Sequence, residues 1–155
     1  MEKTDKTDAF WDSAKASGVS VGDDYWVRRI GANKETVDNI LKLVLDGEKC
    51  GTFGLKDLLD RQSGPGPVVG RDAIVIDMDG ESHAIVKTTK LTPMAYQDIK
   101  EEHLTIEGPG ARKLERWQDI HWPYWTNLLK PHGIDPSQDM IVMVEHFDLI
   151  YPATV

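Results

Sequence analysis

The residues in this sequence that are best suited to chemistry lie in a short glycine-rich motif at positions 47–54. Lys49 supplies a cation or, when desolvated, a base, and Thr52 supplies a hydroxyl that a neighbouring base turns into a nucleophile. Gly47 and Gly51 let the backbone take positive φ angles and let a ligand approach closely. The motif therefore predicts Lys49 and Thr52 as catalytic residues, with Gly47 and Gly51 as substrate-binding residues.

The spacing of Lys49 and Thr52 limits how they can act together. Residues three apart in a regular strand point to opposite faces, so the two side chains share a site only if the chain bends at Cys50-Gly51 or if the segment is still winding out of the preceding helix. A purely structural interpretation makes Gly47 a helix C-cap that is followed by a solvated lysine. Because a residue in a glycine-rich bend contributes little packing, Lys49→Ala is expected to leave the fold intact.

The composition bounds the class of protein. A chain of 155 residues is long enough for one domain with a real core. A net charge of −8 opposes binding to long nucleic acids and anionic membranes, so DNA is not an expected partner and any polyanion site must be a local basic patch. The single cysteine, Cys50, excludes an intrachain disulfide. Because a signal core and a run of about 18 apolar residues are both absent, we expect a cytoplasmic protein without membrane association.

Hydrophobic periodicity predicts a helix directly before the motif. Asn33 is a good N-cap, apolar side chains recur after it at helical spacing, and Gly47 ends the helix. This helix should deliver the motif to a fixed place. Upstream of it, residues 1–24 are expected to form an N-terminal polar tail and a short helix, with residues 1–9 loose and the helix over 10–18.

The chain after the motif alternates between strand and helix signals. Residues 62–67 are too rich in Gly and Pro for either and are interpreted as a loop that could act as a flap beside the site. Runs typical of strands flank Asp79-Gly80, which predicts a hairpin with a type I′ turn. The remaining predicted elements are helical segments over 93–99, 101–107 and 114–129, with a break or restart at Pro123, and a strand over 140–149. This order favours an α+β domain with a curled or barrel-like sheet over residues 25–155.

Several further motifs follow the glycine-rich one in a fixed order. They are Val69-Gly70-Arg71-Asp72 before a strand, Asp98-Ile99 with Glu107-Gly108-x-Gly110, Trp117-x-x-x-His121-Trp122, and the strand with Val144-Glu145-x-Phe147. From about residue 25 to 151, this order resembles the longer bacterial members of the ASCH-domain family. The resemblance implies a PUA-like fold, which is a small β-barrel with surrounding helices, and a cleft that handles RNA or its modified nucleosides.

The same resemblance implies a role for Glu107. Small members of the family are amidohydrolases that deacetylate N4-acetylcytidine with a lysine, a threonine and a glutamate, which match Lys49, Thr52 and Glu107. A longer relative is described as a ribonuclease, with its lysine at the position of Lys49. This chain departs from the longer members at Pro109, where they carry a second glutamate, so the loop loses a carboxylate and is stiffer. We expect a hydrolase of N4-acetylcytidine-type amides, with a ribonuclease or a non-catalytic RNA-binding module as the alternatives.

The roles within the three catalytic candidates stay open at this point. In amide hydrolysis, Thr52 attacks the acyl carbonyl. Either Lys49 is a neutral base that Glu107 positions, or Lys49 remains a cation that stabilises the oxyanion while Glu107 is the base. The expected partner is a small nucleoside or RNA, and nothing in the sequence indicates an oligomeric state.

Further residues are candidates for contacts with the substrate. The set comprises Arg71, His103, His121, Trp122 and Tyr124. A ring near the Pro123 break, from Trp122 or Tyr124, could stack a base, although aromatic side chains at helical spacing commonly belong to the core. The histidines show no spacing typical of a metal site, so neither a metal nor a cofactor is expected.

Overall fold

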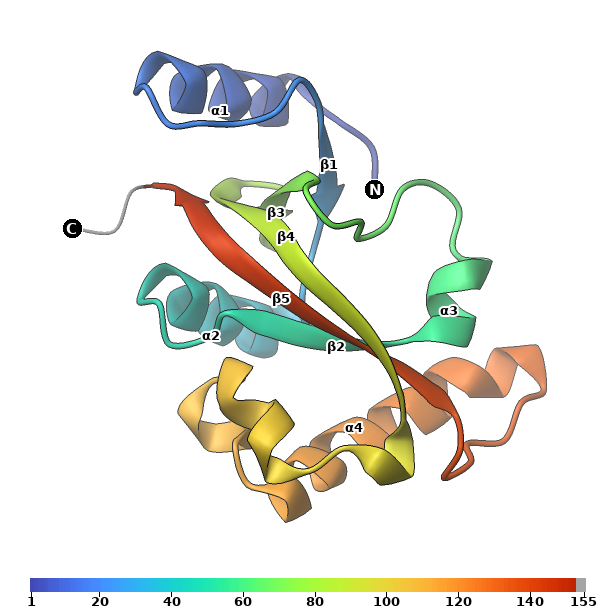
Figure 1. The fold of residues 1–155 in the computed structure, drawn as a ribbon. Coiled ribbons are helices and arrows are strands. Elements are labelled where there is room, and N and C mark those ends of the chain that lie inside the picture. Colours follow the sequence, from blue (N-terminus) through green and yellow to red (C-terminus); the bar gives the residue numbers. More distant parts are fainter. Residues whose placement is uncertain (153–155) are drawn as a thin grey trace.

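The computed structural model describes residues 1–152, and within them a five-stranded sheet forms the centre of the protein (Figure 1). The strands are β1 (Tyr25–Arg28), β2 (Gly51–Leu55), β3 (Asp72–Ile76), β4 (Ser82–Ala95) and β5 (Ile141–Tyr151). The helices are α1 (Asp5–Ala16), α2 (Lys34–Leu45), α3 (Lys56–Arg61) and α4 (Leu114–Leu129). Short 3₁₀ turns cover Tyr96–Asp98, Glu101–Ile106, Pro109–Ala111 and Lys130–His132.

Antiparallel pairing holds most of the sheet together. Its strand order is β1-β3-β4-β5-β2. β4 pairs antiparallel with β3 and β5, β5 pairs antiparallel with β2, and β1 lies parallel to β3. Among the described residues, β1 and β2 are therefore the edge strands, and β2 carries Thr52. A mainly antiparallel sheet with flanking helices confirms the expected α+β class.

The sheet is strongly curled. β3 and β4 stand between β1 and β5, so a flat sheet would hold β1 and β5 about 14 Å apart. Nevertheless, the Arg28 guanidinium on β1 contacts the Glu145 carboxylate on β5 at 2.8 Å. The sheet therefore bends until these strands approach each other across its inner face. Because β1 and β2 do not pair with each other, the sheet is not closed into a barrel.

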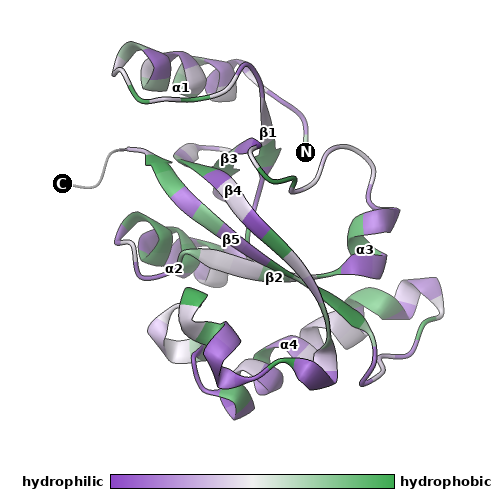
Figure 2. Ribbon diagram, in the orientation of Figure 1, coloured by the Kyte–Doolittle hydropathy of each residue, from purple (hydrophilic) through white to green (hydrophobic). Residues whose placement is uncertain are grey.

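Helices cover both faces of this sheet. On the inner face, α2 packs into a cluster made of Trp26, Val37, Leu41, Val44, Ala73, Val75, Ala84, Val86 and Phe147. On the outer face, α1 and α4 cover opposite ends of the sheet (Figure 1), α1 through Trp11 and Ala14 and α4 through Trp117, Trp125 and Leu129. β5 is mostly apolar, with polar segments in its middle (Figure 2). The predicted final strand is confirmed, but the expectation that both of its sides are mostly buried holds only for its middle, since Ile141 and Asp148 are exposed.

α2 has the caps that its sequence predicts. The Asn33 side chain accepts a hydrogen bond from the Thr36 N–H at 2.9 Å at the start of the helix. At the other end, Gly47 takes a φ of +77°, and its N–H donates to the Val44 carbonyl at 3.1 Å. Both caps are confirmed, and the chain leaves α2 in a fixed direction just before Lys49.

The N-terminal helix begins earlier than predicted. α1 starts at Asp5, because the Thr4 hydroxyl accepts a hydrogen bond from the Thr7 N–H at 3.2 Å and the Thr7 hydroxyl accepts one from the Thr4 N–H at 2.8 Å. This capping box satisfies backbone donors that would otherwise be unpaired at the helix start. The prediction of a loose segment is therefore wrong for residues 5–9.

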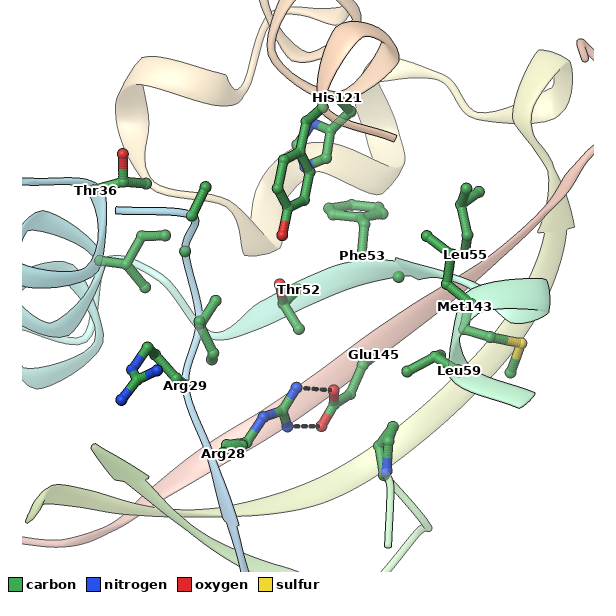
Figure 3. Close-up of a pocket in the computed structure, with 18 of the residues that line it drawn as sticks. Arg28, Arg29, Thr36, Thr52, Phe53, Leu55, Leu59, His121, Met143 and Glu145 are labelled. Carbon is green, nitrogen blue, oxygen red and sulfur yellow. Dashed lines mark hydrogen bonds and ion pairs between the residues drawn. The ribbon is translucent and has the colours of Figure 1, made fainter. Parts of the chain in front are cut away.

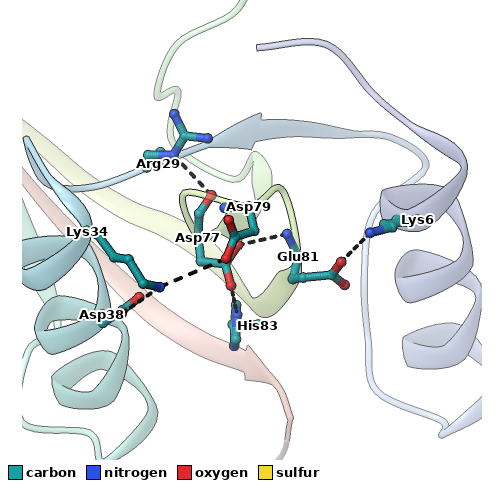
Figure 4. A network of polar contacts seen from close by, with 8 residues as sticks. All are labelled: Lys6, Arg29, Lys34, Asp38, Asp77, Asp79, Glu81 and His83. Carbon is teal, nitrogen blue, oxygen red and sulfur yellow. Dashed lines mark hydrogen bonds and ion pairs between the residues drawn. The ribbon is translucent and has the colours of Figure 1, made fainter.

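The predicted hairpin between β3 and β4 is confirmed, but its turn is not of type I′. That type needs a positive φ at both central residues, and Gly80 has one (+83°) whereas Asp79 does not. Asp77 organises the turn instead, since its carboxylate accepts from the Asp79 and Glu81 N–H groups, both at 2.9 Å. Its carbonyl accepts from Arg29 Nε at 3.1 Å, which attaches the turn to the end of β1 (Figure 4).

The helical segments depart from the prediction at two prolines. Pro93 lies in β4 and does not start a helix. Beyond Lys87, β4 pairs with β5 alone, so the strand tolerates a residue that lacks an N–H. Pro123 lies inside α4, which continues through it. Among the described residues, no helix has the length and apolar character needed to cross a bilayer.

Candidate functional site

A cavity of about 980 Å³ lies where β1, β2 and α4 come together (Figure 3). Its walls include the start of α2, α3 and part of the 62–67 loop, which was predicted to lie beside the site. The predicted site residues that line it are Lys49, Thr52, Glu107, His121 and Tyr124. The fold thus brings the three catalytic candidates to one cavity, although Lys49 and Glu107 are 58 positions apart in the chain.

Lys49 and Glu107 form a buried ion pair in this cavity. Their side chains are 5% and 7% exposed. Arg112 fixes the backbone beside them, because its Nε donates to the Glu107 carbonyl and its Nη2 to the Glu48 carbonyl, both at 2.7 Å. The expectation that Lys49 contributes little packing is therefore wrong, since its side chain is enclosed and paired. Removal of Lys49 alone would leave the Glu107 carboxylate buried without its partner.

Lys49 lies between the end of α2 and the start of β2. The Cys50 N–H donates to the Ile106 carbonyl at 2.9 Å, and β2 begins only at Gly51. Lys49 thus precedes the strand, so the alternation of side chains along β2 does not separate it from Thr52. The Lys49 N–H donates to the Leu43 carbonyl at 3.0 Å, so at Lys49 the segment is still leaving the end of α2, which is the second arrangement that the spacing allowed.

The two glycines predicted to bind substrate lie outside the cavity lining. Gly47 is exposed at the end of α2. A Cβ atom at position 51 would lie only 2.3 Å from the Glu145 carbonyl oxygen. Gly51 is therefore needed for the close pairing of β2 with β5, and neither glycine approaches the space that a ligand would fill.

His121 faces the ion pair from α4, with a side chain that is 13% exposed. Its Nδ1 lies 2.8 Å from the Trp117 carbonyl and therefore carries the proton that it donates, which leaves Nε2 as an acceptor. Nε2 is 3.9 Å from Glu107 Oε2. Burial lowers the pKa of His121, and the neighbouring Glu107 carboxylate offsets this only in part. A neutral imidazole therefore stands beside the pair.

Thr52 and Tyr124 line the cavity from different elements. Thr52 lies on β2 directly opposite Glu145 of β5, so their Cβ atoms are about 5 Å apart on the same face. Figure 3 shows Thr52 beside the Arg28–Glu145 pair. Tyr124 lines the cavity from α4, and burial raises the pKa of its phenol, which therefore remains a neutral hydrogen-bond donor.

A second buried ion pair, Arg28–Glu145, lines the cavity and was not predicted as part of the site. Arg28 Nη1 and Nη2 donate to the two Glu145 oxygens at 2.8 and 2.9 Å, and Thr88 Oγ1 donates to Glu145 Oε2 at 2.7 Å. The side chains of Arg28 and Glu145 are 11% and 3% exposed. A carboxylate in the middle of an apolar strand was the available signal, because a buried charge requires a partner.

Three of the predicted substrate-binding residues lie outside the cavity lining. Arg71 donates to the Gly66 carbonyl at 2.8 Å and holds its loop. His103 accepts a hydrogen bond from the Lys100 N–H at 2.9 Å, and it thereby caps a 3₁₀ turn. Trp122 packs against Tyr96, with ring centroids 5.0 Å apart, on another side of α4. Local structure accounts for all three. In residues 1–152, no group of three His, Cys, Asp or Glu side chains is placed to hold a metal ion.

The curled sheet with helices on both faces is compatible with the PUA-like fold that the resemblance implied, although the sheet is open where a barrel was expected. The chain belongs to the ASCH-domain family, a PUA-like family associated with RNA-related functions, because the family model "ASCH domain" matches residues 26–151. This confirms the predicted family. A comparison with curated proteins finds no match.

The solved structures that are similar to this chain include two crystal structures that match most of its length. An ASCH domain from Lactobacillus crispatus JV V101 shares 22% identity, with a TM-score of 0.85 over 97% of this chain and 98% of that chain. A protein from Enterococcus faecalis V583 shares 21% identity, with a TM-score of 0.80 over 94% of this chain and 88% of that chain. At these identities the likeness concerns the fold.

Proposed function

We propose that this ASCH-domain protein is a hydrolase that removes the acyl group from N4-acetylcytidine-type amides. The observation that carries the proposal is the buried Lys49–Glu107 pair, which lines one cavity with Thr52 and the neutral side chain of His121. A nucleophile, a carboxylate and a cation that are enclosed together suit acyl transfer, because a site with little water strengthens electrostatic stabilisation of the oxyanion.

The contact between Lys49 and Glu107 supports one of the two schemes left open by the sequence. The two groups meet as an ion pair, so Lys49 acts as the cation and Glu107 as the base. Thr52 Oγ attacks the acyl carbon, its proton passes to Glu107, and the Lys49 ammonium stabilises the oxyanion. When the tetrahedral intermediate breaks down, Glu107 returns the proton to the departing N4 amine of cytosine. Water, deprotonated by Glu107, then attacks the Thr52 ester and releases acetate, and Glu107 passes the proton to the departing Thr52 oxygen.

The size of the cavity supports a second candidate function, the cleavage of RNA. A volume of about 980 Å³ is at the upper end of the range for small-molecule sites, and it is large for a single nucleoside. Arg116, near the start of α4, adds a cation to the lining that suits a phosphate. In this function, Glu107 takes the proton of a 2′-hydroxyl and Lys49 stabilises the charged phosphorane.

A single set of incubations distinguishes these functions. The purified protein is mixed separately with N4-acetylcytidine and with a mixed RNA, and cytidine, acetate and RNA fragments are measured by liquid chromatography. Release of equal amounts of cytidine and acetate is expected. Fragments without deacetylation would support the ribonuclease, and retention of intact RNA without either product would support a binding module.

The control is a double variant, Lys49→Met with Glu107→Met. Both charges leave together, so no unpaired charge remains buried and the fold should persist. The variant should be folded and inactive. Deacetylation at the wild-type rate by this variant would refute the proposed site.

A further inference from the structure

Arg28 has hydrogen-bond donors to spare at the wall of the cavity. A guanidinium carries five N–H donors. The bidentate contact with Glu145 uses one from each Nη atom, and among residues 1–152 Arg28 makes no other side-chain hydrogen bond. Arg28 lines the cavity, and its side chain is 11% exposed. A ligand in the cavity is therefore well placed to accept hydrogen bonds from the remaining donors.

The Arg28 guanidinium is held in a fixed position before any ligand arrives. The Trp26 ring lies below it, with the guanidinium carbon 4.8 Å from the ring centroid. Glu145 is fixed in turn by the hydroxyl of Thr88 at 2.7 Å. Donors that are already oriented lose little entropy when a ligand binds, so this is a rigid recognition element.

The charge of the Arg28–Glu145 pair limits the kind of group that it can recognise. Glu145 cancels the positive charge of Arg28, and a phosphate or carboxylate at this point would also be repelled by the Glu145 oxygens. A neutral carbonyl oxygen accepts from the same N–H groups without this repulsion. The chemistry of the pair therefore fits a ring carbonyl of a nucleobase better than it fits a phosphate.

We propose that Arg28 binds the O2 carbonyl of an acylated cytosine and thereby determines which acylated base the protein hydrolyses. This inference rests on the proposed function. Thr52 stands opposite Glu145 on the neighbouring strand, so the nucleophile and the Arg28–Glu145 pair occupy the same face of the sheet. The N4 substituent and the O2 of cytosine are attached to the same ring, two positions apart. A single base thus spans the two groups, with its acyl group at Thr52 and its O2 at Arg28.

The test compares an acylated base that has the 2-oxo group with one that lacks both this group and the N1–H that accompanies it. N4-acetylcytosine carries the 2-oxo group, and 4-acetamidopyrimidine lacks it. The wild type should prefer N4-acetylcytosine in kcat/KM by about tenfold or more, because the other substrate leaves buried Arg28 donors unpaired. In the double variant Arg28→Met with Glu145→Leu, the ratio should fall close to one. A double variant that keeps the wild-type preference would overturn the proposal.

Two further variants make the result specific to Arg28. Arg28→Lys retains the charge that pairs with Glu145 but loses the planar fork, so it should lower the preference and carries the test if the double variant does not fold. Arg29→Met is the matched control. Arg29 lines the same cavity, and its Nε donates to the Asp77 carbonyl at 3.1 Å. This variant should keep the wild-type ratio, and an equal loss of preference there would contradict the proposal.

Calorimetric binding separates failure of this inference from failure of the proposed function. Cytosine and 4-aminopyrimidine are titrated into the wild type and into the Arg28→Lys variant. If no amide is hydrolysed but the wild type prefers cytosine and the variant does not, Arg28 binds the O2 carbonyl as inferred, whereas the proposed function and the specificity of hydrolysis derived from it are wrong. Hydrolysis of both acylated bases at equal efficiency supports the function and overturns the inference. Absence of both hydrolysis and binding overturns both.

Discussion

Replacement of Lys49 by methionine should destabilise the protein strongly. The substitution leaves the Glu107 carboxylate, 7% exposed, without its cation. His121 cannot replace the cation, because burial lowers its pKa and its Nε2 is 3.9 Å from Glu107. An uncompensated buried charge costs about 3–5 kcal/mol. For a chain of this size each kcal/mol lowers Tm by about 2–4 °C, so the melting temperature should fall by about 6–20 °C.

A double-mutant cycle isolates the ion pair from other effects of the substitution. Urea unfolding is measured for the wild type, Lys49→Met, Glu107→Met and the double variant. The double variant should lie within about 1 kcal/mol of the wild type or above it, since removal of both charges leaves none to bury. The coupling free energy should therefore reach about 3 kcal/mol or more. Either of two results would refute this reasoning: a double variant that loses the sum of the unfolding free energies lost by the two single variants, or a Lys49→Met variant that is as stable as the wild type.

This cycle also determines how activity data should be interpreted. An inactive Lys49→Ala variant does not show catalysis by Lys49, because the same substitution disrupts the buried pair. A folded and inactive double variant separates the two effects. Activity and stability should therefore be measured on the same preparations.

The remaining predictions concern Thr52, His121 and Gly51. Thr52→Ser should keep kcat within about tenfold, whereas Thr52→Val should lose about a hundredfold or more in the deacetylation assay; equal rates would exclude the hydroxyl as the nucleophile. The pKa of His121 lies below its ordinary 6.5 in the fold, so the unfolded chain binds the proton more readily and stability should fall as pH drops below 6.5, by at most about 1.4 kcal/mol per pH unit. The free energy of unfolding, measured with urea, should differ less between pH 7.5 and pH 5.5 for His121→Gln than for the wild type. An equal difference in the two proteins would contradict this. Gly51→Ala should lower the free energy of unfolding by at least about 1–3 kcal/mol in the same assay, because the new Cβ would meet a backbone oxygen at 2.3 Å. Gly54→Ala should lower it less, because the closest neighbour of that Cβ is the flexible Leu59 side chain at 3.2 Å.

Local signals were sufficient to predict much of the fold. The caps at Asn33 and Gly47 are confirmed because each depends on backbone groups within one turn. The prediction of a type I′ turn at Asp79-Gly80 was wrong because it used these two residues alone. Contacts of the Asp77 side chain and of Arg29, which lie outside the dipeptide, determine the conformation of the loop. Pro93 was misplaced because strand pairing through β5, more than 40 residues later, overrides the local preference of proline.

The site was less accessible to sequence reasoning than the fold. The resemblance to a family predicted that Lys49 and Glu107 share a site. Periodicity could not predict it, since the two residues are 58 positions apart. Arg28 was missed because its role depends on the curl of the sheet, which brings β1 to Glu145. His103 lies on the 3₁₀ turn Glu101–Ile106, which it caps, whereas Trp122 lies on α4 next to His121 but packs against Tyr96. Neither placement follows from the residue type.

The place of β5 in the strand order has a consequence for how the protein is made. Among the described residues, β2 joins the sheet through β5 alone, and β5 is the last of the five strands to be synthesised. During synthesis, β1, β3 and β4 can pair with one another as soon as they emerge, whereas β2 must wait for residues 141–151. Thr52 therefore reaches its position opposite Glu145 only after residues 141–151 have been synthesised. From the synthesis of β2 until that of β5, the nascent chain carries an unpaired β-strand, and a chaperone would be most useful in this interval.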